Sequence, residues 1–102
     1  MSNEEIVSRI QDGEDLQAEL LQQNEKLIDW IAGRYKMYSE LDDLKQEAAI
    51  ALMEAAKGYA PDSGITFKTY AINSMRWALY RYIQNYGSVI RIPAGEKDKS
   101  IS

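Results

Sequence analysis

One stretch of the sequence combines aromatic rings with positive charge. Residues 63–95 hold six of the ten aromatic residues and four bases, but no acid. On a helix of 3.6 residues per turn, six of its residues share one side or flank it: Asn73, Trp77, Tyr80, Gln84, Arg76 and Arg81. Exposed rings stack on unpaired bases, at about 1–3 kcal/mol per base, and cations hold the phosphates. The pattern therefore predicts a surface that binds single-stranded nucleic acid.

A competing interpretation is that these rings belong to the hydrophobic core. Trp77 or Tyr80 would then pack on a neighbouring helix as an ordinary core residue. Burial separates the two interpretations, because a ring sealed in the interior cannot stack on a base. The nucleic-acid hypothesis fails if Tyr70, Trp77 and Tyr80 are all buried.

A second row of residues follows the predicted helix at 40–57. It mixes carboxylate, amide and apolar groups at three- and four-residue spacing: Asp43, Gln46, Glu47, Ile50 and Met53. Such a row suits a protein partner with a basic helical surface. Surface helices also present acids to water, so the row taken alone leaves both interpretations open.

The composition argues against catalysis. The chain has no cysteine and no histidine, which removes thiol nucleophiles, thiolate metal sites and the commonest general base. Asp42, Asp43 and Glu47 could in principle hold a divalent cation, but no second pair of acids completes the oxygen shell. We therefore predict no catalytic residue, no cofactor and no metal site.

Length, hydropathy and charge favour a binding module of one domain. The chain has 102 residues and 11.6 kDa, with 45% hydrophobic and 27% charged residues, which is typical of a globular domain. It has no long apolar run and no secretory signal at its polar start, so we expect a cytoplasmic protein without a membrane partner. Residues 1–62 carry 14 acids and six bases, a net charge of −8, whereas residues 63–95 carry +4. This asymmetry indicates two partners of opposite charge.

Apolar periodicity predicts an all-α fold, a compact bundle of three main helices plus a short N-terminal helix. Asn3 is expected to cap the short helix, which runs to about Gln11 before Gly13. The first main helix is expected over 15–36, with a break near Asn24.

The second main helix is expected to start at a capping box, Ser39 and Asp42, and to end near Gly58. A turn at 61–64 then leads to Thr66, the expected cap of the last helix, which ends at Gly87. The expected apolar side of that helix is Ala71, Met75, Ala78, Leu79, Tyr82 and Ile83. Residues 88–93 are expected to be extended, residues 1–93 to form one domain, and residues 94–102 to form a polar flexible tail.

Three strings are notable for their order and spacing. They are NEKLIDWIAGRY (24–35), LDDLKQEAAIALMEAAKGYAPDSGITFKTYA (41–71) and IRIP (90–93). Together they resemble conserved region 2 of the bacterial RNA polymerase sigma factors of the sigma-70 family, over residues 14–93. The resemblance implies a helical bundle of the sigma-factor region 2 type that acts in transcription initiation.

The resemblance implies core RNA polymerase as a partner. In the family, the helix that corresponds to 41–57 docks on the clamp helices of the largest polymerase subunit. By motif position, this implies clamp contacts at Asp43, Gln46, Glu47 and Met53, in the same row as Ile50. Ala49 stands where the family often has an asparagine, so one polar contact is expected to be missing.

The resemblance also implies promoter DNA as a partner. In the family, the helix that corresponds to 66–86 recognises the −10 element, helps to open it and captures flipped-out bases of the non-template strand. Flipping a base costs a few kcal/mol, which stacking and neutralised phosphates offset without hydrolysis. The implied DNA-binding residues are Phe67, Lys68, Thr69, Tyr70, Asn73, Arg76, Trp77, Tyr80, Arg81, Gln84 and Arg91.

The sequence departs from the family pattern in three respects. Asn73 and Ser74 stand where many housekeeping members carry a tryptophan pair, and Trp77 follows one helical turn later. The charge of −8 over residues 1–62 would repel a duplex, so DNA binding is expected to need the polymerase. The sequence ends without the helix-turn-helix domain of a full sigma factor, which leaves a fragment or a split factor as alternatives.

Two functional hypotheses therefore remain open. The chain is either an initiation module that recognises and melts the −10 element, or a protein-interaction module that binds the polymerase without melting DNA. A separate chain carrying region 4, or an anti-sigma factor, is a further partner that the resemblance allows.

Overall fold

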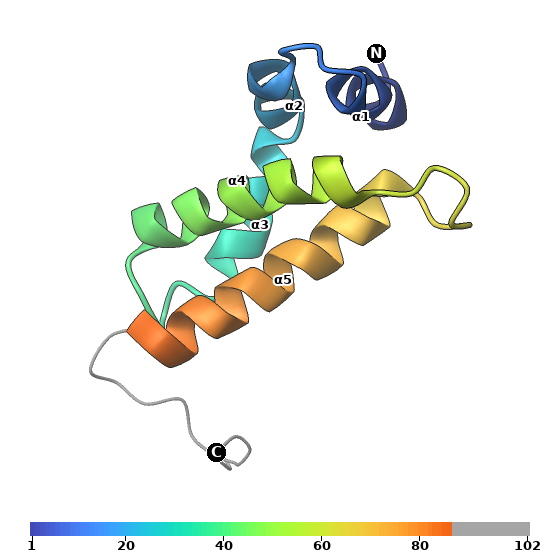
Figure 1. The fold of residues 1–102 in the computed structure, drawn as a ribbon. Helices are drawn as coiled ribbons and strands as arrows, with labels where there is room; N and C mark the ends of the chain where they lie inside the picture. Colours follow the sequence, from blue (N-terminus) through green and yellow to red (C-terminus); the bar gives the residue numbers. More distant parts are fainter. Residues whose placement is uncertain (87–102) are drawn as a thin grey trace.

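All regular secondary structure in the described part of the chain is helical. A computed structural model describes residues 1–86, and the helices within them are α1 (Asn3–Gln11), α2 (Gln17–Gln23), α3 (Glu25–Gly33), α4 (Leu41–Gly58) and α5 (Phe67–Tyr86). The two long helices, α4 and α5, lie side by side in opposite directions, and α3 packs across both (Figure 1). Helices α1 and α2 pack at the end of the bundle where α4 finishes and α5 begins. The predicted all-α class is confirmed.

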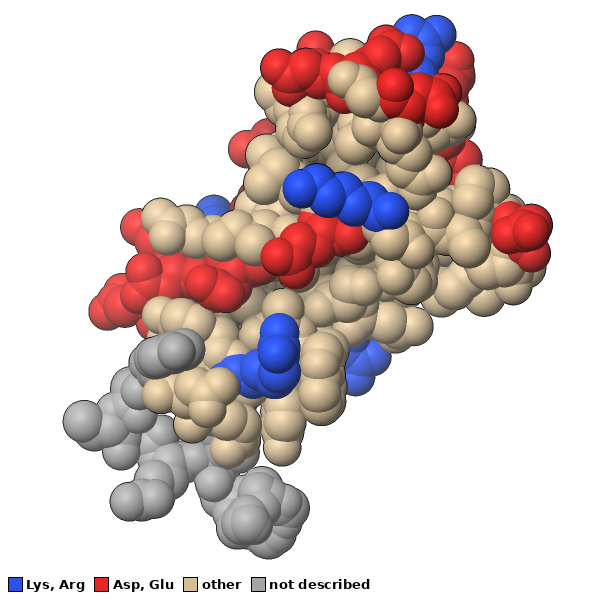
Figure 2. Space-filling model, viewed as in Figure 1, with Lys and Arg blue, Asp and Glu red and all other residues tan. Residues whose placement is uncertain are grey.

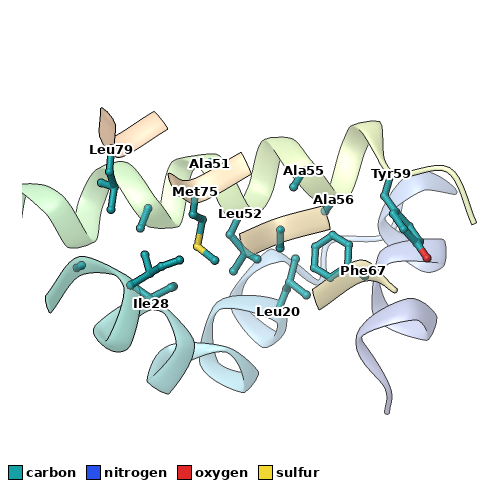
Figure 3. Packing of buried hydrophobic residues seen from close by; sticks show 14 of the residues in the cluster. Leu20, Ile28, Ala51, Leu52, Ala55, Ala56, Tyr59, Phe67, Met75 and Leu79 are labelled. Atoms are coloured by element: carbon teal, nitrogen blue, oxygen red, sulfur yellow. The ribbon is translucent and has the colours of Figure 1, made fainter. Parts of the chain in front are cut away.

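The apolar stripes of all five helices meet in one core. Leu20, Ile31, Leu52, Phe67 and Met75 are fully buried there (relative exposure 0%). Figure 3 shows side chains of α2, α3, α4 and α5 packed in one cluster. The predicted stripe of α5 is confirmed, with four members buried and Ala78 and Tyr82 half-buried. Burial of this stripe fixes which side of α5 is left for partners.

The predicted first main helix is two helices. Asn24 separates α2 from α3 and is buried (6% exposed), with its amide donating to the carbonyl of Leu20 at 2.8 Å and to Oδ1 of Asn3 at 2.9 Å. Asn3 Nδ2 donates back to Asn24 Oδ1 at 3.2 Å. The break near Asn24 is thus confirmed, and α3 ends at Gly33 rather than at Lys36.

Two predicted caps are wrong. Ser2 caps α1 by accepting the backbone N–H of Glu5 at 3.1 Å, whereas Asn3 is the first helical residue and pairs with Asn24 instead. The capping box of Ser39 and Asp42 does not form, because Glu40 directly precedes α4 and makes no side-chain cap bond. Acids in the first turn of α4, at 42 and 43, face the positive end of the helix dipole.

The turn that joins α4 to α5 follows the prediction. Gly64 has a φ of 91°, a conformation that favours glycine, and Ser63 N–H donates to the carbonyl of Ala60. Thr66 Oγ1 accepts the N–H of Thr69 at 3.2 Å, so Thr66 caps α5 as expected. The predictions for Gly87, residues 88–93, the domain boundary at 93 and the tail at 94–102 lie outside the described residues.

Candidate functional site

Helix α5 has one buried side and one exposed aromatic side. Ala71, Met75 and Leu79 have no exposed surface, whereas Trp77 is 61% and Tyr80 42% exposed. Two large apolar rings on the solvent side of a well-packed helix gain nothing from the core of this chain. The alternative that both rings are core residues is therefore excluded.

The two exposed rings lie stacked on each other. The ring centroids of Trp77 and Tyr80 are 5.9 Å apart and their planes differ by 20°. Beside them lies an open hollow of about 600 Å³, which Tyr35, Asn73 and Arg76 complete. The fold thus brings together a flat aromatic surface, a guanidinium and an amide. The rings can stack on a base, the guanidinium can bind a phosphate, and the amide can form hydrogen bonds with the edge of a base.

The charge distribution also favours the exposed side of α5 as the surface that binds DNA. Acidic side chains gather over α1 and α2 and along α4, whereas the visible surface of α5 is uncharged or basic (Figure 2). Lys68, Thr69, Arg76 and Gln84 are exposed on α5, as a DNA-binding surface requires. Arg81 is exposed as well, on the side that faces α4.

Phe67 corrects the predicted DNA-binding set. Its ring has no exposed surface and packs edge-on against Tyr59, with centroids 5.5 Å apart and an interplanar angle of 84°. It lies beside Leu20 in the core (Figure 3). In this fold Phe67 cannot reach DNA, so its role is to anchor the start of α5. Phe67 precedes Ala71 by four residues and so continues the apolar stripe of α5. This spacing is the sequence signal that could have assigned Phe67 to the core.

Tyr70 is half-buried between the core and the surface. Its ring lies against Tyr59, with centroids 5.7 Å apart and an interplanar angle of 51°. The hydroxyl group lies over the end of α4, close enough that a Cβ at Gly58 would stand 3.2 Å from it. The ring is therefore held in place and only partly accessible, and Arg91 lies outside the described residues.

A second hollow, which the sequence did not indicate, lies nearer the start of α5, between that helix and the first three helices. Its volume is about 530 Å³, and its lining is aromatic, amide and basic: Asn3, Gln23, Asn24, Lys26, Leu27, Trp30, Lys68 and Ile72. Trp30 is 53% exposed, and the Arg34 guanidinium lies 5.4 Å from the centroid of its ring. The spacing of Trp30 and Arg34, off the apolar stripe of α3, is the sequence signal that could have found this hollow.

The acidic row of α4 lies outside the core. Asp43, Gln46 and Ile50 are exposed, and Glu47 and Met53 are half-buried. On the other flank of α4, Lys45 Nζ forms an ion pair with Asp29 Oδ1 of α3 at 3.1 Å, which ties these two helices together. The row therefore lies on a helix that is held in place by α3, and its side chains are accessible to a partner.

Two further classes of site find no support among residues 1–86. No three acidic side chains there come together as metal ligands. None of the helices in this part of the chain has the length and apolar character needed to cross a bilayer.

Comparison with known proteins gives one consistent answer. Residues 20–88 match the family described as Sigma-70 region 2. The chain is 32% identical over 99 residues to RNA polymerase sigma factor SigA4 of Synechococcus elongatus, covering 96% of this chain and 32% of that protein. It is 38% identical over 64 residues to the RNA polymerase sigma-B factor of Myxococcus xanthus, covering 62% and 24%.

A plant relative extends the comparison. The chain is 30% identical over 94 residues to the chloroplastic RNA polymerase sigma factor sigF of Arabidopsis thaliana, covering 91% of this chain and 17% of that protein. The chain therefore spans about a third or less of the length of these relatives. No solved structure matches it significantly.

Proposed function

Because the chain belongs to the sigma-70 region 2 family, we propose that it is a transcription-initiation module that acts with RNA polymerase in the cytoplasm. In this proposal α4 binds the clamp helices of the largest polymerase subunit, and α5 recognises and opens the −10 element of promoter DNA. Binding energy alone drives these steps, so the lack of histidine and cysteine is no obstacle.

The stacked, exposed pair of Trp77 and Tyr80 is the single observation that carries the DNA half of the proposal. The two rings are parallel to within 20° before any ligand binds, so a base that stacks on them costs little further ordering. Arg76 lines the same hollow and supplies the charge for a phosphate. An aromatic stack beside a guanidinium, on a segment without acids, suits unpaired bases better than a protein partner.

The second hollow adds a place for a base that has left the stack. The Trp30 indole offers a flat face, and Lys26 and Lys68 offer charge for the backbone. Amides of Asn3 and Asn24 are already paired with each other, so they form a rigid rather than an adaptable wall. We propose that this hollow takes a second flipped-out base, distinct from the base that stacks on Trp77.

A second candidate function rests on Asn73 and Ser74. Asn73 is exposed and Ser74 half-buried, so neither presents a ring at the positions where many housekeeping sigma factors carry a tryptophan pair. The chain would then bind the polymerase, alone or with a separate region-4 chain or an anti-sigma factor, without opening DNA. Crosslinking of Trp77 to a −10 duplex in the reconstituted polymerase complex favours the initiation module that opens DNA. Crosslinking that occurs only with pre-melted DNA in the same complex favours the module that binds polymerase without opening DNA.

The experiment that tests the polymerase half is a binding titration with a purified clamp fragment. Glu47→Lys is expected to abolish binding, because it places a positive charge against a basic partner. Glu19→Lys makes the same change of charge on the exposed side of α2 and is expected to leave binding intact. Unchanged affinity of the Glu47→Lys variant contradicts the assignment of α4 as the polymerase-binding helix.

A further inference from the structure

A groove between α4 and α5 joins two sets of residues that the sequence assigned to different partners. Its volume is about 340 Å³, and it is lined from α4 by Glu47, Ile50, Ala51 and Glu54 and from α5 by Ala78, Arg81, Tyr82 and Asn85. Glu47 and Ile50 belong to the predicted polymerase-binding row, whereas Arg81 was assigned to DNA. The fold thus brings an arginine of the DNA-binding helix to the protein-binding side.

The helical geometry explains why Arg81 leaves the DNA-binding side. Residues 78, 81 and 85 follow each other at spacings of three and four, so they share one side of α5, and that side faces α4. Arg76 lines the hollow of Trp77 and Tyr80 instead, on a different flank. The two arginines of α5 therefore serve different surfaces.

The groove has an apolar floor and charged edges. Ile50 is 47% exposed within it, beside the small side chains of Ala51 and Ala78. Among the described residues, none of the ion pairs involves Glu47, Glu54 or Arg81, so these charges are available to another molecule. Figure 2 shows acidic side chains of α4 and a basic side chain of α5 on either side of the hollow between these helices.

We propose that this groove seats one α-helix of the polymerase clamp, so that α5 as well as α4 contacts the polymerase, through Arg81. This inference rests on the proposed function. Glu47 and Glu54 are seven residues apart, about 10.5 Å along α4, with Ile50 between them. The complementary helix therefore carries two basic residues about seven positions apart, an apolar residue between them and an acid that reaches Arg81.

The test compares two charge reversals on the same helix, first by binding to core polymerase without DNA and then by capture of single-stranded DNA. Arg81→Glu is expected to weaken binding of the full chain to core polymerase at least tenfold. It is expected to leave the salt dependence of DNA binding unchanged. Arg76→Glu, the matched control, is expected to leave polymerase binding unchanged and to weaken capture of single-stranded DNA. Both side chains are exposed, so circular dichroism and thermal unfolding are expected to match those of the unchanged chain.

Each outcome bears on a different claim. Equal polymerase binding by Arg81→Glu and the unchanged chain, while Glu47→Lys disrupts it, overturns the inference and leaves the proposed function standing. A loss confined to DNA binding returns Arg81 to the DNA surface and also overturns it. If the unchanged chain does not bind core polymerase at all, the proposed function fails and the inference falls with it.

Discussion

Removal of the exposed aromatic stack is expected to weaken DNA capture without unfolding the protein. Stacking of a base on an aromatic side chain contributes about 1–3 kcal/mol. Trp77→Ala is therefore expected to raise the Kd for a single-stranded −10 oligonucleotide about 5- to 150-fold, since about 1.4 kcal/mol corresponds to a factor of ten. The assay is fluorescence anisotropy with the chain assembled on core polymerase.

The stacked geometry also sets the result expected for the double variant. Trp77 and Tyr80 lie with centroids 5.9 Å apart, so each ring supports the other. Loss of one ring already disrupts the platform, and the double variant is expected to lose less than the sum of the single losses, by about 0.5–1.5 kcal/mol. Strictly additive losses would show that the rings bind separately rather than as one surface.

Protein stability provides the control for this prediction. Trp77 is 61% exposed, so Trp77→Ala removes little beyond its contact with Tyr80, and the free energy of unfolding is expected to fall by less than about 1.5 kcal/mol. Met37→Ala removes a side chain that is 70% exposed in the turn before α4, and DNA capture is expected to stay unchanged. DNA affinity of Trp77→Ala within twofold of the unchanged chain refutes the assignment of this surface.

Three further predictions concern residues that hold the site in place. Phe67→Ala removes a ring with no exposed surface and is expected to lower the free energy of unfolding in urea by about 3–5 kcal/mol; a loss below about 1 kcal/mol contradicts its place in the core. Asn24→Ala leaves Asn3 without its amide partner and is expected to cost about 1–3 kcal/mol in the same measurement, with Gln22→Ala on the surface of α2 as a neutral comparison. Glu4 Oε2 accepts the N–H of Phe67 at 2.9 Å, so Glu4→Ala is expected to lower the melting temperature by an amount that corresponds to about 1 kcal/mol, and no change would mean that α1 does not support α5.

The contact from Glu4 shows how much α1 contributes to the site. Glu4 bonds the start of α5, Asn3 bonds the junction of α2 and α3, and Gln11 Nε2 donates to the carbonyls of Ala56 and Tyr59 at 2.9 and 2.8 Å. Three polar side chains of one short helix thus fix three other segments. The sequence indicated α1 as a helix but gave no sign of these contacts, because their partners lie 21 to 63 residues away.

The sequence by itself determined the helices, their apolar stripes and the family. Periodicities of three and four residues survive any arrangement of the helices, since the side of each helix that must leave water is a local property. Pairing of distant helices decided the rest. Phe67 and Trp77 are both aromatic residues of α5, yet Phe67 is buried beside Tyr59 and Trp77 is exposed, because α1, α3 and α4 together cover only one side of that helix. In the same way, only the packing of α4 against α5 brought Arg81 beside Glu47 and Glu54, since charge alone does not specify which flank of a helix a neighbour occupies.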